Sequence, residues 1–104
     1  MAQFDVYPNP NPETNTSIPY LLDVQADLLD VLTTRVMAPL YTMESIPKPI
    51  LYLNPVLQLK GESLVLSIAE LAAISKGVVG DPVGNVSIYR DNIITALDFV
   101  FTGI

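Results

Sequence analysis

The sequence has 104 residues, which is the size of one domain with one hydrophobic core. Half of the residues are hydrophobic and 15% are charged, and this composition excludes a disordered chain. Because the chain contains no cysteine and no histidine, disulfides, thiol catalysis, a Ser-His-Asp triad and the usual zinc ligands are excluded. The net charge of −6 disfavours binding to nucleic acid and to anionic lipid, so we infer a protein partner with basic binding segments.

Three short strands are predicted in the first half of the chain, at residues 3–7, 20–25 and 35–41. In the first of them, Phe4 and Val6 alternate with Asp5, as in a strand that buries one face. Pro39 is expected to bend the third strand or to place it at an edge of the sheet, because proline lacks the N–H group that a ladder needs.

Loops are predicted around these strands. Residues 8–19 contain four prolines and form a long surface loop. A linker between domains is the alternative, but only seven residues precede this segment, too few for a domain. Residues 26–34 are ambiguous, with a turn and a short strand as one interpretation, and residues 42–49 are a loop.

The middle of the chain is predicted to hold a hairpin and one further strand, at residues 56–59 with 63–67 and near 74–79. Lys60-Gly61-Glu62 supplies the tight turn of the hairpin. Before it, residues 50–59 hold one or two short strands, interrupted at Asn54-Pro55. A turn at Gly80-Asp81-Pro82 ends this part of the chain.

The end of the sequence changes from strand periodicity to helix periodicity. The apolar positions with spacings of three, four and seven residues are Ile93, Leu97, Val100 and Phe101. Ser87 is predicted to cap the start of this helix, Asp91 lies in its first turns, and Gly103 closes its end in a left-handed conformation.

Many short strands followed by one helix predict a mainly β or α+β fold. We expect a single domain over residues 1–104, an antiparallel sheet or small barrel with the helix packed across it.

The most prominent carboxylate cluster comprises Asp23, Asp27 and Asp30. On one helix face these side chains suit metal binding or acid–base catalysis, but no histidine or oxygen-rich glycine loop accompanies them, which favours a solvated acidic rim. We therefore expect a protein that acts by contact, without catalysis, metal or cofactor. A small enzyme that uses the three aspartates is the alternative.

The cytoplasm is the expected location. The first residues carry neither a basic nor an apolar segment of a signal peptide, and the longest apolar stretch is too short and too rich in proline to span a bilayer.

The apolar end of the chain has two interpretations. Phe99, Val100 and Phe101 either complete the core of the domain or lie at a boundary between subunits and meet a cationic partner. The high apolar content favours a symmetric homodimer that buries one patch twice.

Four segments carry a resemblance to a known family: "QFxVY" at residues 3–7, "YxLDVQADLLD" at 20–30, "RxMxPL" at 35–40 and "RxNIIxAxDFxFxGI" at 90–104. In order, spacing and total length the chain resembles the CcdB toxins of bacterial toxin–antitoxin modules. The resemblance implies a small SH3-like antiparallel barrel with a single C-terminal helix, and a symmetric dimer. It also implies that the dimer poisons DNA gyrase by binding the GyrA subunit, and that a CcdA-type antitoxin neutralises it.

The resemblance also implies two sets of contact residues. Those for gyrase are Thr102, Gly103, Ile104, Asp98, Thr95 and Asp91. Those for the antitoxin are Asp23, Gln25, Asp27, Leu28, Leu29, Asp30 and Arg35.

The chain departs from the family pattern at two positions. Thr102 stands where the tail often has tryptophan, which removes a surface for stacking with an arginine, and Arg90 stands where the best-known members have an acid. A decayed or retargeted family member, dimeric but inactive on gyrase, is therefore the alternative function.

Overall fold

The computed structural model describes residues 1–46 and 48–103, and in this part of the chain the first half holds three strands and one 3₁₀ turn. They are β1 (Asp5–Pro8), β2 (Tyr20–Asp23), the 3₁₀ turn η1 (Asp27–Leu29) and β3 (Thr34–Thr42). The second half holds β4 (Val56–Leu59), β5 (Glu62–Leu66), η2 (Ile68–Glu70), β6 (Ala72–Ser75), η3 (Lys76–Val78), β7 (Gly84–Asn85), η4 (Ser87–Tyr89) and α1 (Arg90–Thr102).

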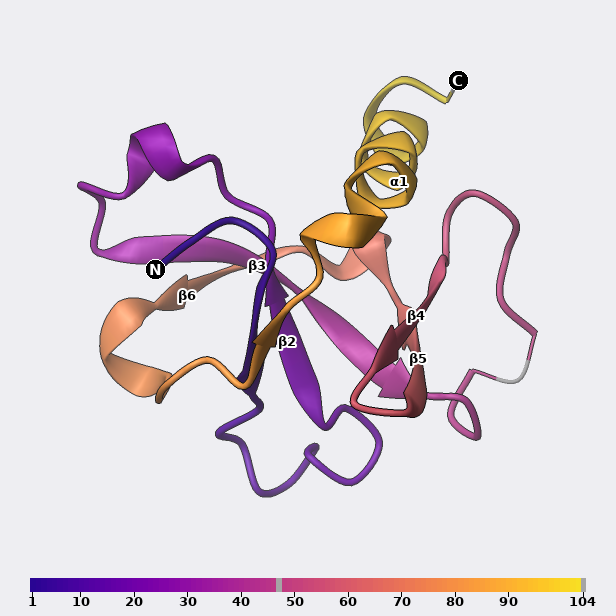
Figure 1. Ribbon diagram of the computed structural model, residues 1–104, viewed down its shortest axis with the longest axis horizontal. Helices are drawn as coiled ribbons and strands as arrows, with labels where there is room; N and C mark the ends of the chain where they lie inside the picture. Colours follow the sequence, from indigo (N-terminus) through magenta and orange to yellow (C-terminus); the bar gives the residue numbers. More distant parts are fainter. Residues whose placement is uncertain (47, 104) are drawn as a thin grey trace.

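The strands form one antiparallel sheet that curls into a nearly closed barrel, with α1 standing over one side of it (Figure 1). The strand order is β4-β5-β3-β2-β1-β7, and β6 pairs with β3 beside β5. This arrangement confirms the predicted α+β class, an SH3-like barrel with a single C-terminal helix. No helix in the described residues is long and apolar enough to cross a membrane.

Pro39 lies at the centre of the sheet, where the prediction of an edge position is wrong. Its carbonyl oxygen accepts a hydrogen bond from Ser67 N (3.0 Å), so the missing N–H faces the same side, where β3 changes partner. Pairing with β6 ends at Met37, and pairing with β5 begins at Leu40. Proline is tolerated because no ladder bond is needed in the gap between these two partners.

The two faces of the sheet bury different side chains. One face holds the apolar core, which includes Phe4, Val6, Leu22, Ala38 and Leu40 and is covered by Ile93 and Ala96 of α1. The opposite face buries Tyr7, Asp23, Arg35 and Met37. The alternation predicted for the first strand is therefore confirmed, but its second face is buried as well, and it is polar.

The hairpin of β4 and β5 has the predicted turn. Lys60 and Gly61 have φ values of 51° and 81°, which give a two-residue turn of the kind that matches the twist of a hairpin. The glycine adopts this conformation without strain, whereas the lysine tolerates it as a loop residue.

Three local predictions need correction. Residues 26–34 contain the 3₁₀ turn η1 and only the first residue of β3, and residues 50–55 form turns closed by bonds from Leu53 N and Asn54 N to Ile50 O. The strand expected near 74–79 lies at 72–75, because Gly77 N donates to Ser75 Oγ and the chain turns there.

The predicted start of the helix lies two residues before the observed one. Ser87 begins the 3₁₀ turn η4, and α1 starts at Arg90 with Tyr89 as its N-cap residue, whose side chain makes no capping hydrogen bond. Asp91 lies in the first turn and Gly103 ends the helix at φ 73°, both as predicted.

Candidate functional site

Arg35 is the centre of a buried ion-pair cluster on the polar face of the sheet. Its side chain is 0% exposed and lies on β3, next to Asp23 on β2, which is also 0% exposed. Arg35 Nε donates to Asp23 Oδ2 (2.7 Å) and Nη2 donates to Asp23 Oδ1 (3.0 Å). This two-point contact is the strongest geometry for an arginine–carboxylate pair and compensates the loss of water around both charges.

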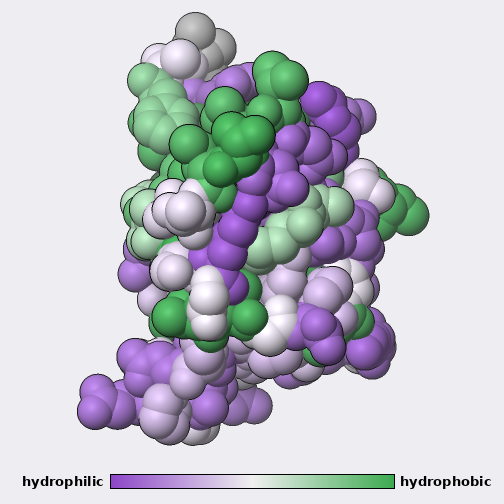
Figure 2. All heavy atoms as spheres, turned by 90° about the vertical axis from the view of Figure 1, so that its left-hand side faces the viewer, coloured by the Kyte–Doolittle hydropathy of each residue, from purple (hydrophilic) through white to green (hydrophobic). Residues whose placement is uncertain are grey.

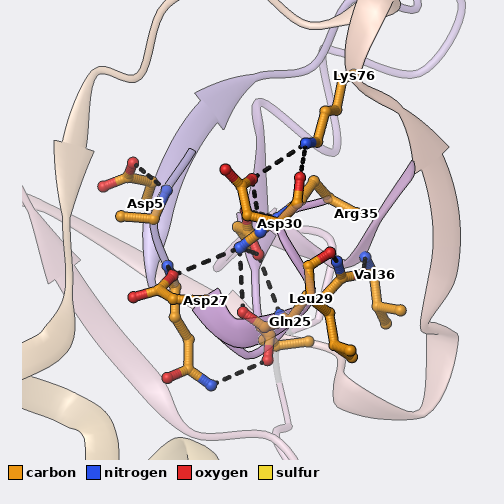
Figure 3. Close-up of polar contacts among 12 residues, drawn as sticks. Asp5, Gln25, Asp27, Leu29, Asp30, Arg35, Val36 and Lys76 are labelled. Atoms are coloured by element: carbon orange, nitrogen blue, oxygen red, sulfur yellow. Dashed lines mark hydrogen bonds and ion pairs between the residues drawn. The ribbon is translucent and has the colours of Figure 1, made fainter. Parts of the chain in front are cut away.

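The remaining donors of Arg35 reach the loop of residues 26–32, which we call the acidic loop (Figure 3). Nη1 donates to Asp30 Oδ1 (3.1 Å), and Nη2 lies 3.8 Å from Asp27 Oδ1. Lys76 Nζ also contacts Asp30 Oδ1 (3.1 Å) and donates to the Asp30 carbonyl. The guanidinium of Arg35 therefore links the acidic loop to β3, and Lys76 links the loop to the end of β6.

Gln25 and Gln3 complete the attachment of the acidic loop. The amide of Gln25 donates to Leu29 O (3.1 Å) and its side-chain oxygen accepts from Val36 N (3.0 Å). The backbone of Gln3 donates to Asp27 Oδ1 (2.7 Å). Among the described residues, each buried side-chain nitrogen or oxygen has a hydrogen-bond partner. Polar contacts therefore fix the position of the loop.

Burial and pairing shift the pKa values in this cluster in different directions. Burial raises the pKa of Asp23 above its usual value, although the hydrogen bond from Arg35 works in the opposite direction. The hydrogen bond from Lys76 lowers the pKa of Asp30. Burial alone lowers the pKa of Arg35, but the hydrogen bond and charge of Asp23 outweigh it and the pKa is raised, so Arg35 stays protonated.

The outer side of the acidic loop is apolar. Leu28 and Val31 are each 89% exposed, and Leu29 and Leu32 are each 46% exposed. Figure 2, which views the side of the molecule that carries this loop, shows hydrophobic atoms in its upper part bordered by hydrophilic ones. Neighbouring exposed leucines and valines with charged residues around them are typical of a contact surface for another protein.

The seven residues that the resemblance assigned to the antitoxin therefore lie together, but at two depths. Asp23, Gln25 and Arg35 are buried beneath the acidic loop, whereas those on the loop itself are exposed. The exposed ones are Asp27, Leu28, Leu29 and Asp30. Val31 and Leu32 extend the surface, and the alternating apolar and acidic residues of "DLLDVL" were a signal for them. The sequence did not predict the contact of Lys76 with the loop, because Lys76 lies 46 residues after Asp30.

The residues assigned to gyrase lie along the outer side of α1. Asp91, Thr95, Asp98, Thr102 and Gly103 are all exposed. Thr102 Oγ1 donates to Asp98 O (2.6 Å), and Gly103 N donates to Phe99 O (3.0 Å), which caps the helix. Ile104 lies outside the described residues. Val100 packs against the core, but Phe101 is 72% exposed, so within the chain the core ends before Phe101.

A groove of about 520 Å³ lies between residues 49–56 and the first turns of α1. Its walls include Ile50, Tyr52 and Tyr89, with Asp91 and Thr95 on the helix side. Two residues of the set assigned to gyrase therefore line a concave and mostly apolar surface. The sequence did not predict that residues 49–56 form its other wall.

Asp23 and the aspartates of the acidic loop are engaged with cations of the chain itself. No group of three or more His, Cys, Asp or Glu residues in the described ranges has a geometry that suits a metal ion. Asp23 and Asp30 instead pair with Arg35 and Lys76.

Comparisons with known proteins agree with this fold. A family model described as CcdB protein matches residues 3–103, and no curated protein matches the sequence. Among solved structures, the chain is similar to one described as an endoribonuclease in complex with its cognate antitoxin, from Mycobacterial species. That match has a TM-score of 0.73 and 14% identity, and it covers 96% of this chain and 93% of the other. At this identity the likeness shows a shared fold.

Proposed function

This chain belongs to the CcdB family, the toxins of toxin–antitoxin modules, and we propose that it inhibits DNA gyrase by binding the GyrA subunit. In this proposal the protein works by contact in the cytoplasm, as a homodimer without a cofactor, and it catalyses no reaction. A CcdA-type antitoxin neutralises it.

The observation that carries the gyrase proposal is the composition of the exposed side of α1. Asp91, Thr95 and Asp98 are exposed along the helix, and Phe101 adds an aromatic ring that is 72% exposed. Carboxylates beside an exposed ring suit an arginine-bearing target, because arginine pairs with the former and stacks on the latter. Phe101 is thus an aromatic side chain at this end of α1 that an arginine of the target can stack on.

The symmetry of the proposed homodimer matches the symmetry of its proposed target. A twofold dimer presents two copies of α1, and GyrA offers two equivalent copies of its own surface, so that both contacts form at once. The exposed ring of Phe101 and the apolar groove beside α1 are surfaces that such a contact would bury.

The acidic loop is the proposed antitoxin surface. Its exposed carboxylates, Asp27 and Asp30, favour a segment with Lys or Arg, and Leu28 and Val31 offer apolar anchors. A disordered antitoxin segment that folds on this loop gains from charge attraction during the encounter. Binding should therefore weaken as salt rises, because exposed charges are screened over about 8–10 Å.

A decayed or retargeted toxin is the second candidate. The hydroxyl of Thr102 donates to Asp98 O within the helix, so this position offers a partner a methyl group and a hydrogen-bond acceptor but no aromatic ring. Endoribonuclease activity is the third candidate function to test, because the similar Mycobacterial protein is described as an endoribonuclease.

The deciding experiment is a gyrase assay with purified protein. We expect it to trap gyrase with cleaved DNA, to bind the GyrA subunit and to kill cells unless they carry a resistant gyrase. Removing residues 102–104 should abolish the trapping while folding and antitoxin binding persist. RNA cleavage without gyrase binding would favour the endoribonuclease, and a folded dimer with neither activity would favour the decayed toxin.

A further inference from the structure

The register of β6 shows which of its backbone groups point away from the sheet. Lys76 N donates to Thr33 O, and Ala72 to Ser75 pair with Met37 to Thr34. In an antiparallel ladder, alternate residues direct their N–H and C=O groups to the same side. The groups of Ala72 and Ile74 therefore face β3, and those of Ala73 and Ser75 face away.

This outer side of β6 is a free edge in the described part of the chain, where β6 pairs with β3 alone. Ala73 and Ser75 are exposed, and their backbone N–H groups make no hydrogen bond to a described residue. Two donors and the Ala73 carbonyl are therefore available to an added strand.

The other two edges of the sheet are protected. In β4 the outward N–H of Gln58 donates to the hydroxyl oxygen of Tyr89 (3.2 Å), so the turn η4 already occupies that donor. The strand β7 has only two residues, Gly84 and Asn85, too few to template another strand. Proteins usually protect their edges with charge, proline or cover, and β6 has none of these within Ala72–Ser75.

The free edge adjoins the acidic loop. Ile74 pairs with Arg35 across the ladder, so their side chains lie on the same face, the one that the acidic loop covers. Lys76, the residue after β6, contacts Asp30 of the loop at 3.1 Å. A strand added to β6 would therefore direct every second side chain to the same face as the acidic loop and its exposed leucines.

We propose that the antitoxin adds an extended segment to β6 as a further antiparallel or parallel strand, with apolar and basic side chains that meet the acidic loop. The inference rests on the proposed toxin–antitoxin function and assigns the backbone contact within it. Backbone hydrogen bonds supply affinity in such strand addition, and side chains supply specificity.

Charge selects this occupant over a second copy of the chain. A β6-to-β6 contact would bring together two chains of net charge −6 with two acidic loops, and the exposed carboxylates of Asp27 and Asp30 would repel their counterparts. A segment bearing Lys or Arg is attracted by the same carboxylates.

Amide exchange followed by NMR tests the proposal directly. The probes are a purified CcdA-type antitoxin and a synthetic peptide in which valine alternates with lysine. With either probe we expect the exchange of Ala73 N–H and Ser75 N–H to slow at least tenfold, while Ile74 N–H, already bonded to β3, changes little. A valine–glutamate peptide should give no protection.

A proline substitution tests the same contact by affinity. Ala73→Pro removes an outward donor and no ladder bond, so the protein should fold normally and bind the antitoxin at least tenfold more weakly. Ala73→Val keeps the N–H and should bind like the wild type. Binding of the antitoxin with no protection at residues 73 and 75, or with no loss in Ala73→Pro, overturns the inference and leaves the proposed function standing.

Two further outcomes separate the remaining interpretations. Protection in the free protein that disappears on dilution would show that a second copy occupies the edge, and it would overturn the inference. If the antitoxin binds nowhere on the chain, the antitoxin part of the proposed function fails, and the assignment of the antitoxin to β6 fails with it.

Discussion

The acidic loop and the end of α1 both expose large apolar side chains, but the chain supports them in opposite ways. The loop has no buried residue in its 3₁₀ turn, and a buried arginine holds it through charged contacts. The helix is held by Ile93 and Ala96 in the apolar core, and the exposed Phe101 and Thr102 at its end lie beyond that core. A contact surface can therefore be fixed from beneath by ions or carried outward by a packed helix.

The difference predicts how each surface fails. Loss of an ionic support leaves uncompensated charge inside the sheet, so damage to the loop should also damage the fold. Loss of side chains at the helix end should change contacts while the fold persists, because Phe101 and Thr102 are exposed.

The largest effect should come from Arg35→Ala. It leaves the buried carboxylate of Asp23 without its partner, and we expect the free energy of unfolding to fall by about 3–5 kcal/mol. Urea unfolding measures this loss. Arg90→Ala, at an exposed arginine, is the control and should change stability by less than about 0.5 kcal/mol. Similar values for the two variants would mean that the cluster does not support the fold.

An effect of intermediate size should appear at alkaline pH. Burial, followed by the charges of Asp5 and Asp23, raises the pKa of Tyr7 from 10.0 to about 12. Between these values the unfolded chain loses the phenolic proton while the folded chain keeps it, so a rising pH favours unfolding. The contribution is intact below pH 10 and about 2 kcal/mol should be lost by pH 12.

Thermal unfolding from pH 9 to 12 checks this prediction. Tyr7→Phe should flatten the pH dependence, and Tyr52→Phe, at a tyrosine that is 59% exposed, should keep it. Equal slopes in the two variants would place the titrating group elsewhere.

A smaller effect is expected at the helix end. Gly103 has φ 73°, and alanine in this left-handed conformation costs about 1–2 kcal/mol. Gly103→Ala should therefore lower the unfolding midpoint slightly and loosen the last turn, as hydrogen exchange of the Gly103 amide would report. Gly80→Ala, at a glycine without positive φ and with open space around it, should be neutral. A neutral Gly103→Ala would show that the cap contributes nothing.

The smallest effects on stability are expected for alanine substitutions at Leu28 and Phe101, which should separate antitoxin binding from GyrA binding. Leu28 is 89% exposed and Phe101 is 72% exposed, so alanine at either should change the free energy of unfolding by less than about 0.5 kcal/mol. Under our proposal, Leu28→Ala weakens antitoxin binding and Phe101→Ala weakens GyrA binding. Binding titrations with both partners check this, and exchanged phenotypes would reverse the assignment of the two surfaces.

Local signals predicted most of the fold. The alternation around Phe4, the turn at Lys60-Gly61 and the helix closed by Gly103 depend on neighbouring residues, and all three are confirmed. The edge position predicted for Pro39 is wrong because its place in the sheet depends on β5 and β6, which lie some thirty residues later in the sequence. Secondary structure that is decided by distant partners leaves no local pattern.

The candidate site divides in the same way. The exposed part of the acidic loop could be anticipated from adjacent leucines between aspartates. The burial of Asp23 and Arg35 could not, because charged residues are ordinarily exposed and only their pairing within the sheet makes their burial tolerable. The free edge of β6 follows from the register alone, which no sequence pattern shows.

The pairing of β1 with β7 has a consequence for the synthesis of the protein. Asp5 accepts a hydrogen bond from Asn85, 80 residues later, so the barrel closes only when almost the whole chain is available. Contacts of this range make folding slow relative to helical proteins of equal size. A nascent chain on the ribosome therefore carries the acidic loop for most of its translation without a closed barrel beneath it. The surface proposed for the antitoxin is therefore complete only after the chain has been released.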